Sequence, residues 1–82
     1  MYFVYILYSP SLNKFYVGFT GDSVEARLSK HLANHKGFTS KTKDWKIKRI
    51  EKFEFKTEAM LREKEIKKWK NRKKIEKLCT ND

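Results

Sequence analysis

The chain has 82 residues, of which 39% are hydrophobic, and its 20 Lys and Arg against 10 Asp and Glu give a formal net charge of +10. This length fits a single domain over residues 1–82 with one compact core. Cys79 is the single cysteine, which excludes an internal disulfide framework and fits a reducing compartment. No apolar run is long enough for a membrane helix, and the N-terminus does not resemble a signal peptide. We therefore expect a cytoplasmic protein with no membrane association.

The basic residues are concentrated near the C-terminus, where residues 62–77 hold nine basic and three acidic side chains. A stripe of this density is typical of a polyanion-binding surface, although it also fits a solvated helical face that confers solubility. Sixteen of the twenty basic residues are lysines, which favours attraction to phosphates over the reading of bases. The charge pattern therefore favours a nucleic-acid partner.

Two apolar, aromatic runs open the chain, at residues 2–8 and 14–20, with a turn containing Pro, Ser and Asn between them. This arrangement predicts a β-hairpin whose first strand is covered on both faces. In such a hairpin Tyr5 and Tyr16 can lie side by side on one face. Gly18, within the second run, indicates either a bulge or a group that approaches the backbone closely.

An amphipathic helix is expected next. Asp22 is its expected N-cap, and Glu25, three residues on, completes a capping box. Arg27 lies beside the apolar stripe of this helix, and its long side chain can reach the sheet. It fits either a surface ion pair or a group that binds a phosphate. The two histidines do not predict a zinc site, because no third ligand is near them. The stripe itself consists of Val24, Leu28, His31, Leu32 and His35.

The rest of the chain predicts a strand and two helices after a basic loop at residues 36–44. Residues 45–55 have the pattern of a third strand, bent or bulged near residues 49–51. Thr57 is the expected N-cap of the next helix, which breaks near Asn71 and restarts as a short basic helix. The element order is then β-β-α-β-α-α, which is an α+β domain.

Two acidic residues of the first of these helices are candidate ligands for a cation. Glu63 lies on the helical face expected to pack on the sheet, where a carboxylate must be paired or must bind a cation. Lys67, four residues on, offers an ordinary helix ion pair. Glu65 has a comparable claim, and helical geometry alone does not choose between the two.

Four features of the sequence, taken in chain order, resemble the motifs of the GIY-YIG nuclease superfamily. Ten residues separate Tyr5 from Tyr16 in the two tyrosine motifs. Arg27 matches the arginine of the family's first helix, and a segment ending at Glu63 resembles the one that carries the family's metal-binding glutamate. Phe3 stands at the leading glycine of the first motif, and Phe19 at a position where relatives often have lysine. The matching segments are Phe3-Val4-Tyr5, Tyr16-Val17-Gly18 and Ala59-Met60-Leu61-Arg62-Glu63. Residues 38–45 and 63–69 also look like the small stand-alone subgroup related to the nuclease domain of the excision-repair protein UvrC.

The resemblance implies a small three-stranded antiparallel sheet flanked by helices. It implies a metal-dependent DNA endonuclease that selects DNA structure rather than sequence, in DNA repair or recombination. Tyr5 and Tyr16 would be active-site phenols, one of them the base for the attacking water, and Arg27 would stabilise the phosphate. Glu63, rather than Glu65, would bind one divalent ion, Mg²⁺ or Mn²⁺. The implied supporting residues are Gly18 and His31.

DNA is the expected partner, bound through its backbone, and nothing in the sequence implies a partner protein. The alternatives are a nucleic-acid-binding module that keeps the fold without catalysis and an adaptor for an acidic protein. The residues expected to contact the DNA backbone are Lys36, Lys41, Lys43, Lys67, Lys70, Arg72, Lys73 and Lys74.

Overall fold

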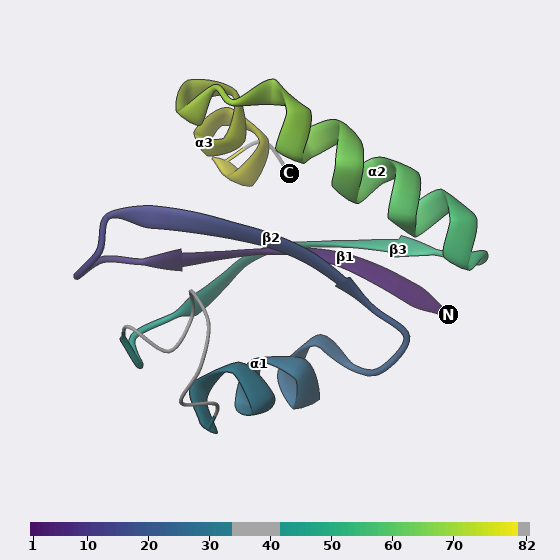
Figure 1. The fold of residues 1–82 in the computed structure, drawn as a ribbon, viewed down its shortest axis with the longest axis horizontal. Coiled ribbons are helices and arrows are strands. Elements are labelled where there is room, and N and C mark those ends of the chain that lie inside the picture. The colour runs from purple at the N-terminus through teal and green to yellow at the C-terminus, as the bar shows by residue number, and fades with distance from the viewer. Residues whose placement is uncertain (34–41, 81–82) are drawn as a thin grey trace.

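The computed structural model of the protein describes residues 1–33 and 42–80, and it has one sheet between two layers of helices. Helix α1 covers one face of the sheet, while α2 and α3 cover the other (Figure 1). None of the helices in these two ranges is long and apolar enough to cross a membrane. The predicted α+β order is confirmed. The elements are β1 (Tyr2–Ser9), β2 (Lys14–Thr20), α1 (Val24–Ala33), β3 (Lys46–Phe53), α2 (Lys56–Trp69) and α3 (Arg72–Thr80).

The sheet has three antiparallel strands in the order β2-β1-β3, so that β1 is central and β2 lies at an edge. Because β1 is covered on both faces, four successive residues, Val4 to Leu7, are each at most 1% exposed. Alternation along the strands sends neighbouring side chains to opposite faces. In the hairpin register Tyr5 lies opposite Gly18, which places both on the same stretch of the sheet.

Each face of the sheet has its own apolar core. The core under α1 is formed by buried residues that include Tyr5, and the core under α2 and α3 completes the other layer. The α1 core contains Tyr5, Leu7, Val24 and Trp45, with Tyr16, Leu28 and Leu32 among the residues packed against it. The α2 core contains Val4, Ile6, Val17, Ala59 and Ile66, with Phe15, Trp69, Ile75 and Leu78 among those packed against it.

The predicted irregularity in the third strand is present, slightly earlier than expected. The register between β1 and β3 shifts between Ile6 and Leu7, which leaves Lys48 as an extra residue in β3. The bulge reverses the direction of the side chains that follow it. As a result Ile47 packs under α1, whereas Phe53 packs under α2.

Helix α1 begins one residue later than the sequence predicted. Ser23, not Asp22, is the N-cap, because the Ser23 hydroxyl accepts a hydrogen bond from the Ala26 backbone N–H at 3.2 Å. The Ser23 carbonyl also accepts the first helical bond, from the Arg27 N–H at 3.1 Å. The prediction of Asp22 as the cap is therefore wrong, since the neighbouring serine fulfils that role.

The predicted N-cap of α2 is wrong as well. Thr57 lies inside the first turn, and Phe55 occupies the cap position. The Glu58 carboxylate accepts a hydrogen bond from the Phe55 backbone N–H at 3.3 Å, which satisfies the chain as it enters the helix. The negative charge of Glu58 also lies near the positive end of the helix dipole, as expected.

The predicted break near Asn71 is confirmed. Lys70 ends α2 in the left-handed region with φ 46°, and the Asn71 side chain accepts a hydrogen bond from the Lys74 N–H at 3.3 Å at the start of α3. A residue with a Cβ is strained at such a position, whereas glycine is not.

The Lys70→Gly variant is therefore expected to raise the free energy of unfolding by about 0.5 kcal/mol in urea denaturation. A lower free energy than that of the wild type would contradict this.

A carboxylate joins the β1–β2 turn to the segment that enters β3. The Asp44 carboxylate accepts hydrogen bonds from the Ser9 hydroxyl at 2.6 Å, the Ser11 backbone N–H at 2.9 Å and the Thr42 hydroxyl at 2.8 Å. These donors, the buried Ser9 hydroxyl foremost, hold the pKa of Asp44 well below its usual range. The charged form of Asp44 therefore stabilises the fold.

This depressed pKa predicts a specific loss of stability in acid. The contribution of Asp44 is fully present above the pKa of about 3.9 that an aspartate has in the unfolded chain, and is lost as the pH falls towards the lower folded pKa. We expect the melting temperature of the Asp44→Asn variant to be lower than that of the wild type at neutral pH. The difference should narrow in acid. Two curves that remain parallel down to pH of about 2 would contradict the assignment.

Candidate active site

Tyr5 and Tyr16 lie together on the α1 face of the sheet, as the hairpin pattern predicts. Their ring centroids are 6.5 Å apart, with 32° between the ring planes. The Tyr16 ring also meets the buried Trp45 ring edge-on, with the centroids 6.4 Å apart. Tyr5 is 1% exposed and Tyr16 is half-buried. The two phenols therefore have different access to solvent, although they share one stretch of the sheet.

Gly18 allows the Tyr5 ring to lie flat across the edge strand. A Cβ atom at Gly18 would be 2.5 Å from the Tyr5 hydroxyl oxygen and 2.7 Å from the ring carbon that bears it. Real Cβ atoms essentially never approach other atoms so closely. The group whose close approach the sequence indicated is thus the phenol of Tyr5 itself. The Tyr5 hydroxyl can occupy this position because Gly18 has no side chain.

Arg27, on α1, connects the helix to this phenol. Burial raises the pKa of Tyr5, a hydrogen bond with the Arg27 guanidinium opposes that rise, and the negative charge of Glu63 adds to it. The net result is a raised pKa, so the positive charge does not outweigh burial here. Tyr5 is consequently protonated at neutral pH, and its hydroxyl is a hydrogen-bond donor in this state.

Glu63 reaches the same place from α2, on the other side of the sheet. Its side chain is only 17% exposed and pairs with Lys67 at 3.6 Å, and its charge acts on the Tyr5 phenol. Glu65 is different, since its side chain is 57% exposed and pairs with Arg62. Of these two acids, Glu63 is therefore the one whose charge acts on the Tyr5 phenol. We refer to Tyr5, Tyr16, Arg27 and Glu63 as the cluster. It lies at the β2 edge and combines side chains from the hairpin, α1 and α2.

Glu63 carries the carboxylate of this cluster, which is the type of group that Mg²⁺ prefers as a ligand. Within residues 1–33 and 42–80, no three His, Cys, Asp or Glu side chains are grouped so that they could hold a metal. Mg²⁺ does not require such a cage, because it is commonly bound through one or two carboxylates, water and substrate phosphates. A half-buried carboxylate with one long ion pair fits that mode of binding. The His31 side chain and His35 lie outside the described residues.

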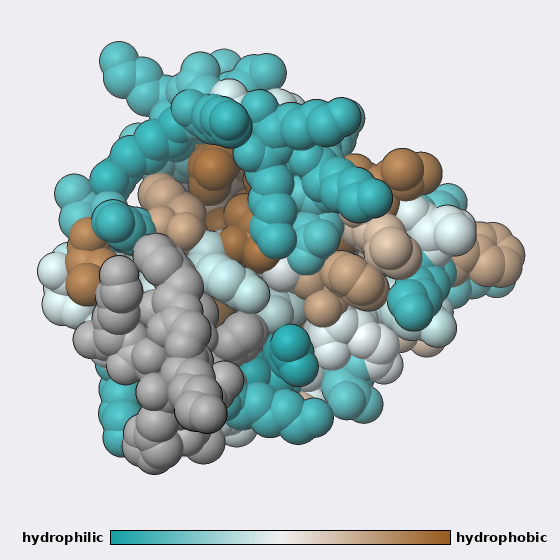
Figure 2. Space-filling model, viewed as in Figure 1, coloured by the Kyte–Doolittle hydropathy of each residue, from teal (hydrophilic) through white to brown (hydrophobic). Residues whose placement is uncertain are grey.

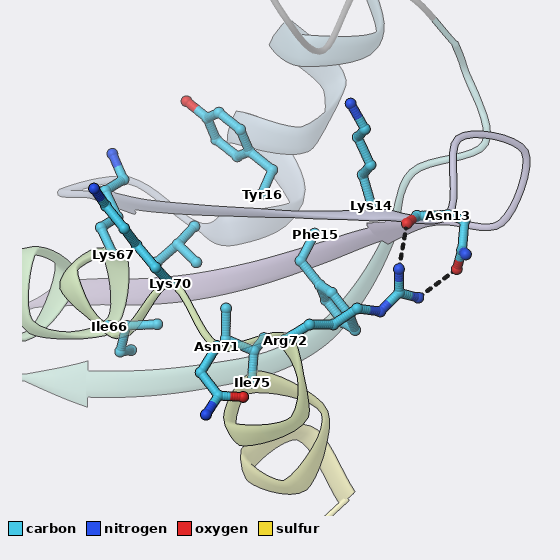
Figure 3. Close-up of a pocket in the computed structure, with 11 residues that line it drawn as sticks. Asn13, Lys14, Phe15, Tyr16, Ile66, Lys67, Lys70, Asn71, Arg72 and Ile75 are labelled. Atoms are coloured by element: carbon cyan, nitrogen blue, oxygen red, sulfur yellow. Dashed lines mark hydrogen bonds between the residues drawn. The ribbon is translucent and has the colours of Figure 1, made fainter.

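A groove of about 720 Å³ lies beside this cluster, between β2 and the junction of α2 and α3 (Figure 3). Three of the residues expected to bind DNA line it, and the sequence analysis missed Asn13 and Lys14. Strand alternation directs the Lys14 and Tyr16 side chains to the α1 face of β2, so these two residues border the groove and point away from its floor (Figure 3). The lining consists of Asn13, Lys14, Phe15, Tyr16, Val17, Ile66, Lys67, Lys70, Asn71, Arg72 and Ile75.

The remaining residues expected to bind DNA lie apart from this groove or outside the described residues. Lys73 is exposed on α3, and the Lys74 ammonium lies 5.0 Å from the centre of the Trp69 ring. Lys43 is exposed just before β3. Lys36 and Lys41, with most of the predicted basic loop, belong to the residues that the structure does not describe. Their role in binding stays a prediction.

The fold and the cluster together define a class of protein, a small α+β domain with tyrosines, an arginine and a glutamate at the edge of a three-stranded sheet. The family model of the GIY-YIG catalytic domain matches residues 1–76, and the chain therefore belongs to the GIY-YIG family. No match was found among curated proteins or among solved structures. Membership confirms the superfamily that the sequence resembles. It indicates nuclease activity on DNA, in a family that generally uses a divalent metal.

Proposed function

We propose that this protein is a divalent-metal-dependent endonuclease that hydrolyses phosphodiester bonds in branched or single-stranded DNA, in DNA repair or recombination. One observation carries the proposal, the convergence of four side chains from α1, the hairpin and α2 at the β2 edge, in a chain of a nuclease family. Selection of DNA structure rather than sequence fits a basic surface that is rich in lysine. The four side chains are Tyr5, Tyr16, Arg27 and Glu63.

The roles follow from the chemistry of the groups. One of the two tyrosines, once it has lost its own phenolic proton, accepts a proton from water as the water oxygen bonds to phosphorus. The bond from phosphorus to the leaving oxygen breaks, and that oxygen takes up a proton from solvent. The Arg27 guanidinium stabilises the charge that develops on the phosphate. Mg²⁺ or Mn²⁺, held by Glu63, would neutralise charge on the phosphate and on the leaving oxygen. In the protein without DNA, burial keeps the Tyr5 hydroxyl protonated, so it is a hydrogen-bond donor in the same site.

The basic side chains supply the affinity. Lys67 and Lys70 lie beside the cluster in the groove, and the net charge of +10 attracts the DNA backbone from a distance. Each phosphate contact releases counterions, so affinity should fall steeply as salt rises. This part of the proposal does not depend on catalysis.

The test is a nicking assay on single-stranded, branched and fully paired DNA, with Mg²⁺ or Mn²⁺ and with EDTA as the control. We expect cleavage of the first two substrates, little cleavage of the paired one, and none in EDTA. Binding measured in parallel should weaken with salt. Salt-sensitive binding without cleavage under any metal would contradict the proposal and support the non-catalytic binding module instead.

A further inference from the structure

The groove beside the cluster combines an apolar floor with positive charges. Its floor is formed by side chains of β2, α2 and α3, which contribute to the core below them. Figure 2 shows apolar side chains exposed at the bottom of a hollow, beneath hydrophilic side chains of the helical layer. A surface that served only to attract phosphates would need the charges but not the floor. Phe15 and Ile75 are the partly exposed residues of the floor, and Val17 and Ile66 are buried there. The cations that line the groove are Lys14, Lys67, Lys70 and Arg72.

The groove is continuous with the catalytic cluster. Tyr16 borders it from β2, with its ring on the α1 face of that strand, and Lys67, which lines the groove, is the ion-pair partner of Glu63. In Figure 3 the Lys67 and Lys70 side chains extend from the end of α2 towards the side of β2 on which the Tyr16 ring lies. A chain of phosphates that is cut at the cluster would therefore pass directly into the groove.

Arg72 closes the other end of the groove. Its guanidinium donates hydrogen bonds to the Asn13 backbone carbonyl at 2.7 Å and to the Asn13 side-chain oxygen (Figure 3). It also pairs with Glu76 at 2.8 Å and lies 5.6 Å from the centre of the Phe15 ring. Arg72 is thus held in place by the hairpin turn, and the groove has a limited length.

We propose that this groove binds one unpaired nucleotide of the DNA strand, next to the phosphate that is cut. The base lies on the apolar floor, and the adjoining phosphates meet Lys67 and Lys70. A cleft of about 720 Å³ is within the usual range for small-molecule sites, and a single nucleotide matches its combination of an apolar face with negative charge. This binding mode rests on the proposed endonuclease function and would explain why the enzyme selects DNA with unpaired bases.

An unpaired nucleotide fits this groove better than paired DNA does. In a duplex both faces of each base are covered by stacking, so the base cannot cover an apolar surface of the protein. A single strand exposes those faces, and proteins that bind single strands combine positive grooves with apolar or aromatic platforms for the bases. The lack of polar groups on the floor means that all four bases should be accepted.

The test measures binding in EDTA, where no cleavage interferes. Fluorescence anisotropy compares a labelled oligothymidylate with an abasic strand of the same length and charge, and with paired DNA. We expect the wild type to bind the oligothymidylate at least about fivefold more tightly than the abasic strand. The Lys70→Gln variant should lose about threefold in affinity for the oligothymidylate. Lys64→Gln is the matched control, because Lys64 is an exposed lysine of α2 that does not line the groove.

The Lys70→Gly variant guards against loss of folding. It removes the same charge while it relieves the left-handed strain at this position, so weaker binding by this variant does not arise from unfolding. Equal affinity for the oligothymidylate and the abasic strand would overturn the inference. So would equal losses in Lys70→Gln and Lys64→Gln. Neither result would contradict the proposed nuclease activity. Conversely, absence of cleavage in the nicking assay would not contradict a preference for strands that carry bases.

Discussion

Replacing Glu63 with glutamine is expected to lower the metal-dependent cleavage rate by at least about a hundredfold. The amide keeps the size of the side chain but removes the negative charge that would hold a divalent ion. Within residues 1–33 and 42–80 no group of three His, Cys, Asp or Glu side chains could hold the ion in place of Glu63. DNA affinity without metal should be unchanged or slightly higher, since a negative charge near the phosphates is removed. Single-turnover cleavage and anisotropy measure the two quantities separately.

Glu65→Gln is the matched control for this experiment. Glu65 lies on the same helix, but its side chain is 57% exposed and pairs with Arg62 instead of lying near the tyrosines. Its replacement should leave the cleavage rate close to that of the wild type. If Glu63→Gln cleaved as fast as the wild type, or if Glu65→Gln were the inactive variant, the assignment of Glu63 would be wrong.

Replacing Gly18 with alanine is expected to disable the site and to destabilise the fold. The added methyl would lie 2.5 Å from the Tyr5 hydroxyl oxygen, and the ring is packed in the α1 core with almost no exposure. The ring cannot move aside without opening that core, which costs about 1–3 kcal/mol for an overpacked site. Displacement of the hydroxyl should also lower the cleavage rate by at least about tenfold. Urea denaturation and single-turnover cleavage check the two effects.

Gly21→Ala is the control for this effect. A Cβ atom at Gly21 would come no closer than 3.3 Å to a neighbouring atom, which belongs to the half-buried Tyr2 ring. A shift of a few tenths of an ångström accommodates that contact. We therefore expect stability and cleavage close to those of the wild type. A Gly18→Ala variant that was as stable and active as Gly21→Ala would show that the Tyr5 ring does not depend on Gly18.

The sequence carried most of the fold because periodicity is a strong local signal. The apolar run of β1 predicted a strand covered on both faces, and residues 4–7 are buried on both. The prediction of Asp22 was wrong because the neighbouring Ser23 is equally able to cap the helix, and its hydroxyl is the one that faces the free Ala26 N–H. The prediction of Thr57 was wrong because α2 begins directly after Phe55, whose backbone N–H bonds to the Glu58 carboxylate. The β3 bulge was expected, but its position depends on the pairing with β1, which a single strand does not encode.

The candidate site was predictable in its parts and not in its assembly. Strand alternation placed Tyr5 beside Tyr16, whereas helical geometry did not decide between Glu63 and Glu65. The structure separates these acids, because Leu61 is 68% exposed and shows that the face carrying Glu65 is turned to solvent. The direction of the Tyr5 pKa also required the structure, since burial and the guanidinium act in opposite directions. The groove joins segments distant in sequence, so no local pattern reveals it.

The central claim is that the phenol, guanidinium and carboxylate at the β2 edge cleave DNA. The most direct measurement follows cleavage and binding of one branched DNA substrate by the wild type and by Tyr5→Phe, with Mn²⁺ present throughout. Removal of the Tyr5 hydroxyl leaves the basic groove intact, so we expect binding to persist while the cleavage rate falls by at least about a hundredfold. Equal cleavage by both proteins, or binding without cleavage by either, would contradict the claim.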